Sequence, residues 1–254
     1  MIAAVLLMLC LVELAYFMRQ DMAEYASFKL LTETRDRQRR FLKWVGKSFL
    51  LFTGTSLVCL AILGRMSLVL RSPVEFLGLT ANLRAVVPPS QLDRGFLIGF
   101  GGAVAAGLIG GIVLATVMAK KRKKQAKVVV IGDIAALMPR NAAETWCTAL
   151  LSLNAGLGEE LFFRLLLPLL LAMVIGNALM AFAVAAVIFG LVHRYQGWVG
   201  ILATTVLGVV FSVLSLWSRS LAAVMCIHAG LDMVGLVVRP TIMRMIERGR
   251  GASG

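Results

Sequence analysis

Three charged side chains lie inside one of the most apolar stretches of the chain. They are Glu159, Glu160 and Arg164, in the segment GEELFFRLLL at positions 158–167. Even on the mildest scale, a charged residue at the centre of a membrane helix costs roughly 2.5–3.5 kcal/mol. A chain that keeps three such residues together needs a pairing scheme or a chemical role for them, and their spacing predicts both.

Helical spacing separates the two glutamates. Glu160 and Arg164 are four residues apart, so they share one helix face, with Glu N-terminal to Arg in the favourable order for an ion pair. Glu159 points about 100° away from Glu160 and has no partner on its own helix. Water, a histidine or protonation must therefore stabilise Glu159. A buried carboxylate in such a setting is suited to act as a general base.

The two histidines of the chain both lie in apolar runs. His193 follows Phe189 by four residues, and His228 precedes Asp232 by four residues on the same helix face. A single histidine in an apolar helix is more often a satisfied core residue than a catalyst. Here, however, two histidines, an unpaired glutamate and an aspartate can converge, and ionisable residues inside membrane spans are functional candidates.

The composition predicts a membrane protein built from helices. Of the 254 residues, 59% are hydrophobic, and the mean hydropathy is +0.88. Soluble domains are usually about 45–50% apolar. The excess falls in runs that can cross a bilayer, which takes about 20 residues per helix. We therefore expect an all-α, polytopic bundle of about seven transmembrane helices with an intramembrane polar cavity.

The apolar runs and the charged stretches between them define the expected organisation. The first run lacks the basic flank of a signal peptide, so we expect it to stay as a helix. We expect spans at 1–18, 48–70, 95–119, within 142–175, and at 177–193, 198–216 and 221–238. Between them we expect loops at 19–47 and 71–94, a basic run at 120–127, an interfacial or re-entrant segment at 128–138, and a helix break at Asn154, Gly156 and Gly158. The chain thus divides into N-terminal helices and loops (1–141), a core with the polar residues (142–238) and a basic tail (239–254).

The distribution of basic residues predicts the orientation. A net charge of +13 would indicate nucleic-acid binding in a soluble protein, but here Lys and Arg lie between apolar runs. One alternating set of loops holds 20 of them and the other set holds 4. The positive-inside rule then places the N-terminus outside and the C-terminus in the cytoplasm. We expect a cell-membrane protein that contacts lipid and binds no nucleic acid.

Three motifs in order resemble the CPBP, or ABI, family of CAAX-processing and bacteriocin-processing intramembrane proteases, which includes the type II CAAX prenyl endopeptidases. The likeness covers roughly residues 142–238, and it is strongest to bacterial members. The motifs are EExxxR (Glu159, Glu160, Arg164), FxxxH (Phe189, His193) and HxxxD (His228, Asp232).

The resemblance implies a glutamate-type endopeptidase that hydrolyses a membrane-embedded or lipid-associated peptide. By it, Glu159 activates water, His193 positions that water, and His228 with Asp232 stabilises the oxyanion. The remaining motif residues then support the site; they are Glu160, Arg164 and Phe189.

Two positions depart from the family pattern. Leu165 stands where many members have Gly, and Asp232 stands where the prenyl endopeptidases have Asn. An ionised aspartate cannot donate a hydrogen bond to an oxyanion. Asp232 is therefore either protonated, or it orients His228 as a cation.

Other readings of the same residues remain alternatives. We expect no cofactor, but Glu159, His193 and His228 form a two-His-one-carboxylate set of the kind that holds catalytic zinc, although HExxH is absent. A non-catalytic membrane scaffold or regulator would use the polar cluster only for structure. A transporter or proton pathway would also place polar groups in spans, but the two halves show no inverted repeat. The sequence leaves the substrate and the oligomeric state open.

Overall fold

The computed structural model describes residues 1–89 and 134–251. These residues form helices and connecting turns with no β-strand, so the prediction of an all-α bundle is confirmed. The expected third span at 95–119 and the basic run at 120–127 lie outside the described residues, as does most of the segment at 128–138.

A helical hairpin opens the chain. Helix α1 covers Ile2–Lys29 and α2 covers Thr34–Ser48; α2 continues through a π-helical turn, η1 (Phe49–Gly54), into α3 (Thr55–Ile62). Short 3₁₀ turns η2 (Met66–Val69) and η3 (Val74–Phe76) then lead to α4 (Leu77–Val86), and η5 (Ala135–Leu137) precedes the next long helix.

The expected charged loop at 19–47 is wrong, because α1 and α2 continue through most of it. The reason is a set of contacts between the two helices. Glu24 of α1 accepts hydrogen bonds from Lys43 (3.2 Å), Trp44 (2.7 Å) and Lys47 (3.0 Å) of α2. Charged residues that indicate a solvated loop in the sequence thus join two helices in the fold.

The C-terminal half contains the motif-bearing helices. The elements are α6 (Ala142–Glu160), η6 (π-helical, Leu161–Leu166), α7 (Leu167–Ile175), α8 (Ala178–Val192), η7 (Arg194–Gln196), α9 (Gly197–Ser218), α10 (Leu221–Met233), η8 (π-helical, Val234–Val238) and α11 (Arg239–Gly251). The expected break at Asn154–Gly158 is wrong, since α6 is continuous there. Asn154 instead donates hydrogen bonds across to α2, to Ser48 Oγ (2.7 Å) and the Val45 carbonyl (3.3 Å).

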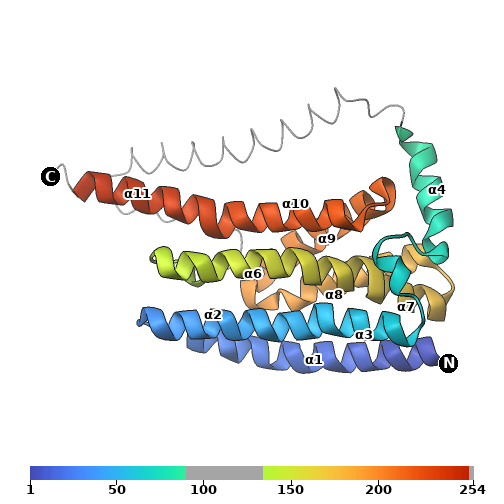
Figure 1. The fold of residues 1–254 in the computed structure, drawn as a ribbon, viewed down its shortest axis with the longest axis horizontal. Coiled ribbons are helices and arrows are strands. Elements are labelled where there is room, and N and C mark those ends of the chain that lie inside the picture. The colour runs from blue at the N-terminus through green and yellow to red at the C-terminus, as the bar shows by residue number, and fades with distance from the viewer. Residues whose placement is uncertain (90–133, 252–254) are drawn as a thin grey trace.

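Most helices lie roughly along the long axis of the molecule, whereas α4 runs across it at one end (Figure 1), and α1 begins at the end opposite to that where α11 finishes. Four helical stretches of the described chain are long and apolar enough to cross a membrane, namely Ile2–Lys29, Thr34–Ile62, Arg194–Ser218 and Leu221–Ile246. Helix α8 is a shorter apolar helix. The inside–outside orientation stays a prediction from the loop charges.

A glycine brings α6 and α10 into close contact. A Cβ atom added to Gly156 would lie 2.6 Å from both the backbone nitrogen and the Cβ of Ala229. Only hydrogen fits in that space, because real Cβ atoms do not approach backbone so closely. Gly156 is three residues before Glu159, and Ala229 follows His228 directly. The close approach therefore sets the relative position of two motifs.

We expect Gly156→Ala to lower the melting temperature of the purified protein in detergent, because overpacking a closely packed contact costs about 1–3 kcal/mol. Gly230→Ala is the matched control, since a Cβ at Gly230 of α10 meets nothing within 4 Å. In that open helical position alanine is expected to stabilise the folded protein by roughly 0.4–1 kcal/mol. Equal melting temperatures for the two variants would contradict the role given to Gly156.

Candidate active site

Four polar side chains from three helices meet at one place. Glu159 is the second-last residue of α6, His193 caps the C-terminus of α8, and His228 and Asp232 lie on α10. Glu159 Oε2 is 3.9 Å from Nε2 of His193 and 3.9 Å from Nε2 of His228, while His228 Nε2 is 3.7 Å from Asp232 Oδ2. All four predicted catalytic side chains are thus brought together. The separations exceed those of direct hydrogen bonds, so the groups face one another across a small space.

A cavity of about 260 Å³ opens at this cluster. All four side chains line it, together with residues of η5, η7, α9 and η8. A second cavity of about 100 Å³ borders Glu159 and His193 from the side of α1 and α2. Its walls include the aromatic side chains of Phe17, Tyr25, Trp44, Phe52 and Tyr195. Glu159 Oε2 is buried and has no hydrogen-bond partner among the described residues, so it remains available to a bound group.

The pairing predicted for the other glutamate is present. Arg164 Nε lies 3.1 Å from Glu160 Oε2, and both side chains are almost fully buried. The atoms are not aligned as a hydrogen bond, so the contact is an electrostatic one. The Arg164 guanidinium also lies over two aromatic rings, with its carbon 4.2 Å from the centre of Phe189 and 5.3 Å from that of Phe211. The ring faces stabilise the cation where water is excluded.

Glu160 has a second partner that the sequence does not reveal. Its Oε1 lies 2.7 Å from Nδ1 of His228, which is on α10 and 68 residues away. Glu160 therefore joins Arg164 on its own helix to His228 on the neighbouring one. Helical spacing predicts the first partner, Arg164, because it lies on the same helix four residues later. The second depends on how α6 packs against α10, and the only sequence signal for that packing is the small residue at Gly156.

His193 is held in one tautomer by the end of its own helix. Nδ1 of His193 is 2.7 Å from the carbonyl oxygen of Phe189, which can only accept a hydrogen bond. Nδ1 therefore carries the proton, and in the neutral ring Nε2 is an acceptor. This Nε2 is the atom that faces Glu159. Phe189 thus supports the site through its backbone as well as through its ring.

The η5 segment closes one side of both cavities. Leu137 lines each of them and is buried. Arg37 of α2 holds this segment by donating to the carbonyl oxygens of Ala136 (2.9 Å) and Met138 (3.3 Å). The same guanidinium donates to Glu144 of α6 at 3.1 Å, and both of these side chains are fully buried. The sequence gives no sign of this contact, because its partners are about 100 residues apart.

A metal site is the alternative for the same cluster. In residues 1–89 and 134–251, no group of three or more His, Cys, Asp or Glu side chains has the arrangement of a metal site. His193 nevertheless presents a free Nε2 acceptor, the form in which histidine binds metals.

The fold and the cluster define a polytopic helical membrane protein with a buried carboxylate–histidine site. Residues 141–234 match the family model described as type II CAAX prenyl endopeptidase Rce1-like. The match begins at the N-terminal end of α6, ends at the start of η8 and includes all seven motif residues. It confirms, for this part of the chain, the resemblance to the CPBP, or CAAX-protease-like, family that was drawn from the motifs. Neither a curated protein nor a solved structure matches the chain.

Proposed function

We propose that the chain is an intramembrane endopeptidase in which Glu159 is the general base that activates water. The observation that carries the proposal is the position of Glu159 Oε2. This atom has no hydrogen-bond partner among the residues that the structure describes, borders the cavity and lies 3.9 Å from Nε2 of both histidines. Such a separation fits two groups that contact one shared water molecule. The family match supports the reaction type, since it is to an endopeptidase family.

In this proposal Glu159 and His193 hold the attacking water between them. Both facing atoms are acceptors, because Glu159 is a carboxylate and His193 carries its proton on Nδ1. A water molecule can donate one hydrogen to each and direct its lone pair at a peptide carbonyl carbon. As the oxygen–carbon bond forms, one proton passes to Glu159. Glu159 then returns that proton to the leaving amine when the carbon–nitrogen bond breaks.

His228 supplies the charge that stabilises the oxyanion. Its Nδ1 donates to Glu160, and its Nε2 faces Glu159 and Asp232. With carboxylates near both ring nitrogens, an imidazolium is well compensated and can donate Nε2–H to the developing oxyanion. We assign Asp232 the role of orienting this cation. An ionised Asp232 cannot itself donate to the oxyanion, unlike the asparagine at that position in the prenyl endopeptidases.

The test is a comparison of membrane peptides from cells that express the wild-type chain or Glu159→Gln. We expect one or more substrates to accumulate uncut in the variant and to be cleaved in membranes that contain the wild type. The cleavage assay is repeated after treatment with a zinc chelator, and we expect full activity to remain. Loss of activity that returns with added zinc would replace the general-base mechanism with a metal-assisted one.

The outcomes also distinguish the other functions. If no peptide differs between the two membranes while a partner protein is lost from Glu159→Gln, the chain is a scaffold. Solute or proton flux into liposomes that contain the purified chain would instead indicate a transporter. Either result would contradict the endopeptidase proposal.

A further inference from the structure

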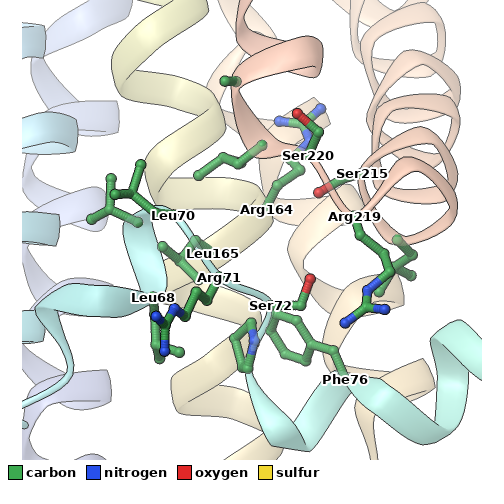
Figure 2. Close-up of a pocket in the computed structure, with 15 residues that line it drawn as sticks. Leu68, Leu70, Arg71, Ser72, Phe76, Arg164, Leu165, Ser215, Arg219 and Ser220 are labelled. Carbon is green, nitrogen blue, oxygen red and sulfur yellow. The ribbon is translucent and has the colours of Figure 1, made fainter.

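A separate pocket of about 130 Å³ is formed by segments at the end of the bundle where α1 begins (Figure 1), and neither Glu159 nor either histidine lines it. It is formed by the turn between η2 and η3, part of η6, the C-terminal end of α9 and the start of α10 (Figure 2). The loop charges predict this end of the bundle to be outside the cytoplasm. The proposed hydrolysis makes no use of the pocket.

The pocket is lined by three arginines and by no acidic residue. Arg71 and Arg219 are exposed, and in the part of the chain that the structure describes their guanidinium groups form no hydrogen bond or ion pair. Figure 2 shows them on opposite sides of Ser72. Arg164 is buried at the base; it forms an ion pair with Glu160, and within residues 1–89 and 134–251 none of its side-chain nitrogens has a hydrogen-bond partner. Guanidinium groups whose N–H donors are unpaired among the described residues therefore line this pocket.

A helix N-terminus adds to the positive potential. Helix α10 begins at Leu221, and Leu221 and Ala222 both line the pocket. Ser220 caps the helix by accepting a hydrogen bond from the Ala223 amide, while Ser220 also lines the pocket. The first amide groups of a helix are free of intrahelical partners, and they favour an anion. Arginines and a helix N-terminus on one pocket are a typical arrangement for binding phosphate.

We propose that this pocket binds a phosphate oxyanion, either as free phosphate or as the headgroup of an anionic phospholipid. Arg71 and Arg219 would hold the phosphate oxygens from two sides, above the start of α10. Apolar residues complete the wall and suit the glycerol and acyl part of a lipid; they are Leu70, Leu165, Leu216 and Leu221. Leu165, where many family members have Gly, thus contributes apolar surface to this wall.

The experiment compares three forms of the full-length protein purified in detergent: wild type, Arg71→Gln/Arg219→Gln, and Arg84→Gln. Each is titrated with inorganic phosphate and, separately, with phosphatidylglycerol or phosphatidylcholine, and binding is followed by melting temperature and by native mass spectrometry. We expect phosphate or phosphatidylglycerol to stabilise the wild type more than phosphatidylcholine does. In the double variant we expect the affinity for that anion to fall about 10-fold or more, because charge-assisted hydrogen bonds are lost.

Arg84 of α4 is the matched control, because it carries the same charge but does not line the pocket. Arg84→Gln is expected to bind like the wild type. Stabilisation by phosphate alone would assign the site to the free anion, and stabilisation by phosphatidylglycerol alone would assign it to a lipid; both support the proposal. If no anion stabilises the wild type, or if Arg84→Gln loses as much binding as the double variant, the proposal is wrong.

Discussion

Glu159→Gln is expected to lower the rate of peptide cleavage by about 10²- to 10⁴-fold, the range that a general base contributes. The amide keeps the size of the side chain but cannot take a proton from water. The fold is expected to stay intact, because Glu159 Oε2 forms no hydrogen bond within the described residues. The measurement is the initial cleavage rate of a substrate identified by the membrane-peptide comparison, together with the melting temperature of the same sample.

Glu160→Gln is the matched control, because it makes the same chemical change one residue away. It leaves the buried Arg164 without a compensating charge, and breaking one side of a buried pair costs roughly 3–5 kcal/mol. We therefore expect the melting temperature to fall for Glu160→Gln and to stay near the wild-type value for Glu159→Gln. A Glu159→Gln protein that cleaves at the wild-type rate would exclude Glu159 as the base.

Arg37→Met is expected to destabilise the protein by roughly 3–5 kcal/mol, because it leaves the fully buried Glu144 without its charged partner. The substitution also removes the donors that hold the Ala136 and Met138 carbonyls on either side of Leu137. The side of both cavities formed by η5 should then loosen. The measurement is unfolding in detergent with added denaturant, and limited proteolysis can follow whether cleavage occurs near η5.

Arg39→Met serves as the control for this prediction. Arg39 lies on the same helix, but its contact with Asp36 is 3.8 Å long and both side chains are more than half exposed. Exposed pairs contribute about 0–1 kcal/mol, so little change is expected. Equal destabilisation by Arg37→Met and Arg39→Met would show that loss of positive charge on α2 is what matters, and not the buried contact.

Sequence reasoning succeeded where the contact is local. Glu160 and Arg164 are four residues apart on one helix, and their pairing follows from helical geometry alone. The bond between Glu160 and His228 joins two helices, so it depends on the depth and rotation at which α6 meets α10. Neither the hydropathy of the sequence nor the spacing of its residues gives this depth or this rotation. The motif resemblance grouped residues that the fold brings close together, but it did not pair Glu160 with His228.

The wrong boundaries have a related cause. Charge between two apolar runs predicted a loop at 19–47, yet Glu24 and its three partners on α2 keep both stretches helical. Glycine and asparagine in α6 predicted a break, yet Gly156 permits contact with Ala229 and Asn154 bonds to α2. In each case a residue that disfavours a membrane helix in isolation contacts a neighbouring helix, and that contact stabilises the helical conformation.

The π-helical turn η6 has a consequence for how this site can change during evolution. A π turn contains one residue more than the corresponding α turn, since its hydrogen bonds run from i to i+5. Deleting one residue between Glu160 and Arg164 would therefore restore a regular α turn, but it would place Arg164 three positions after Glu160 and alter their contact. The apolar residues of the turn are all buried, so a change of side-chain volume there also destabilises the fold. The length of the segment and the packing of its side chains are thus both constrained.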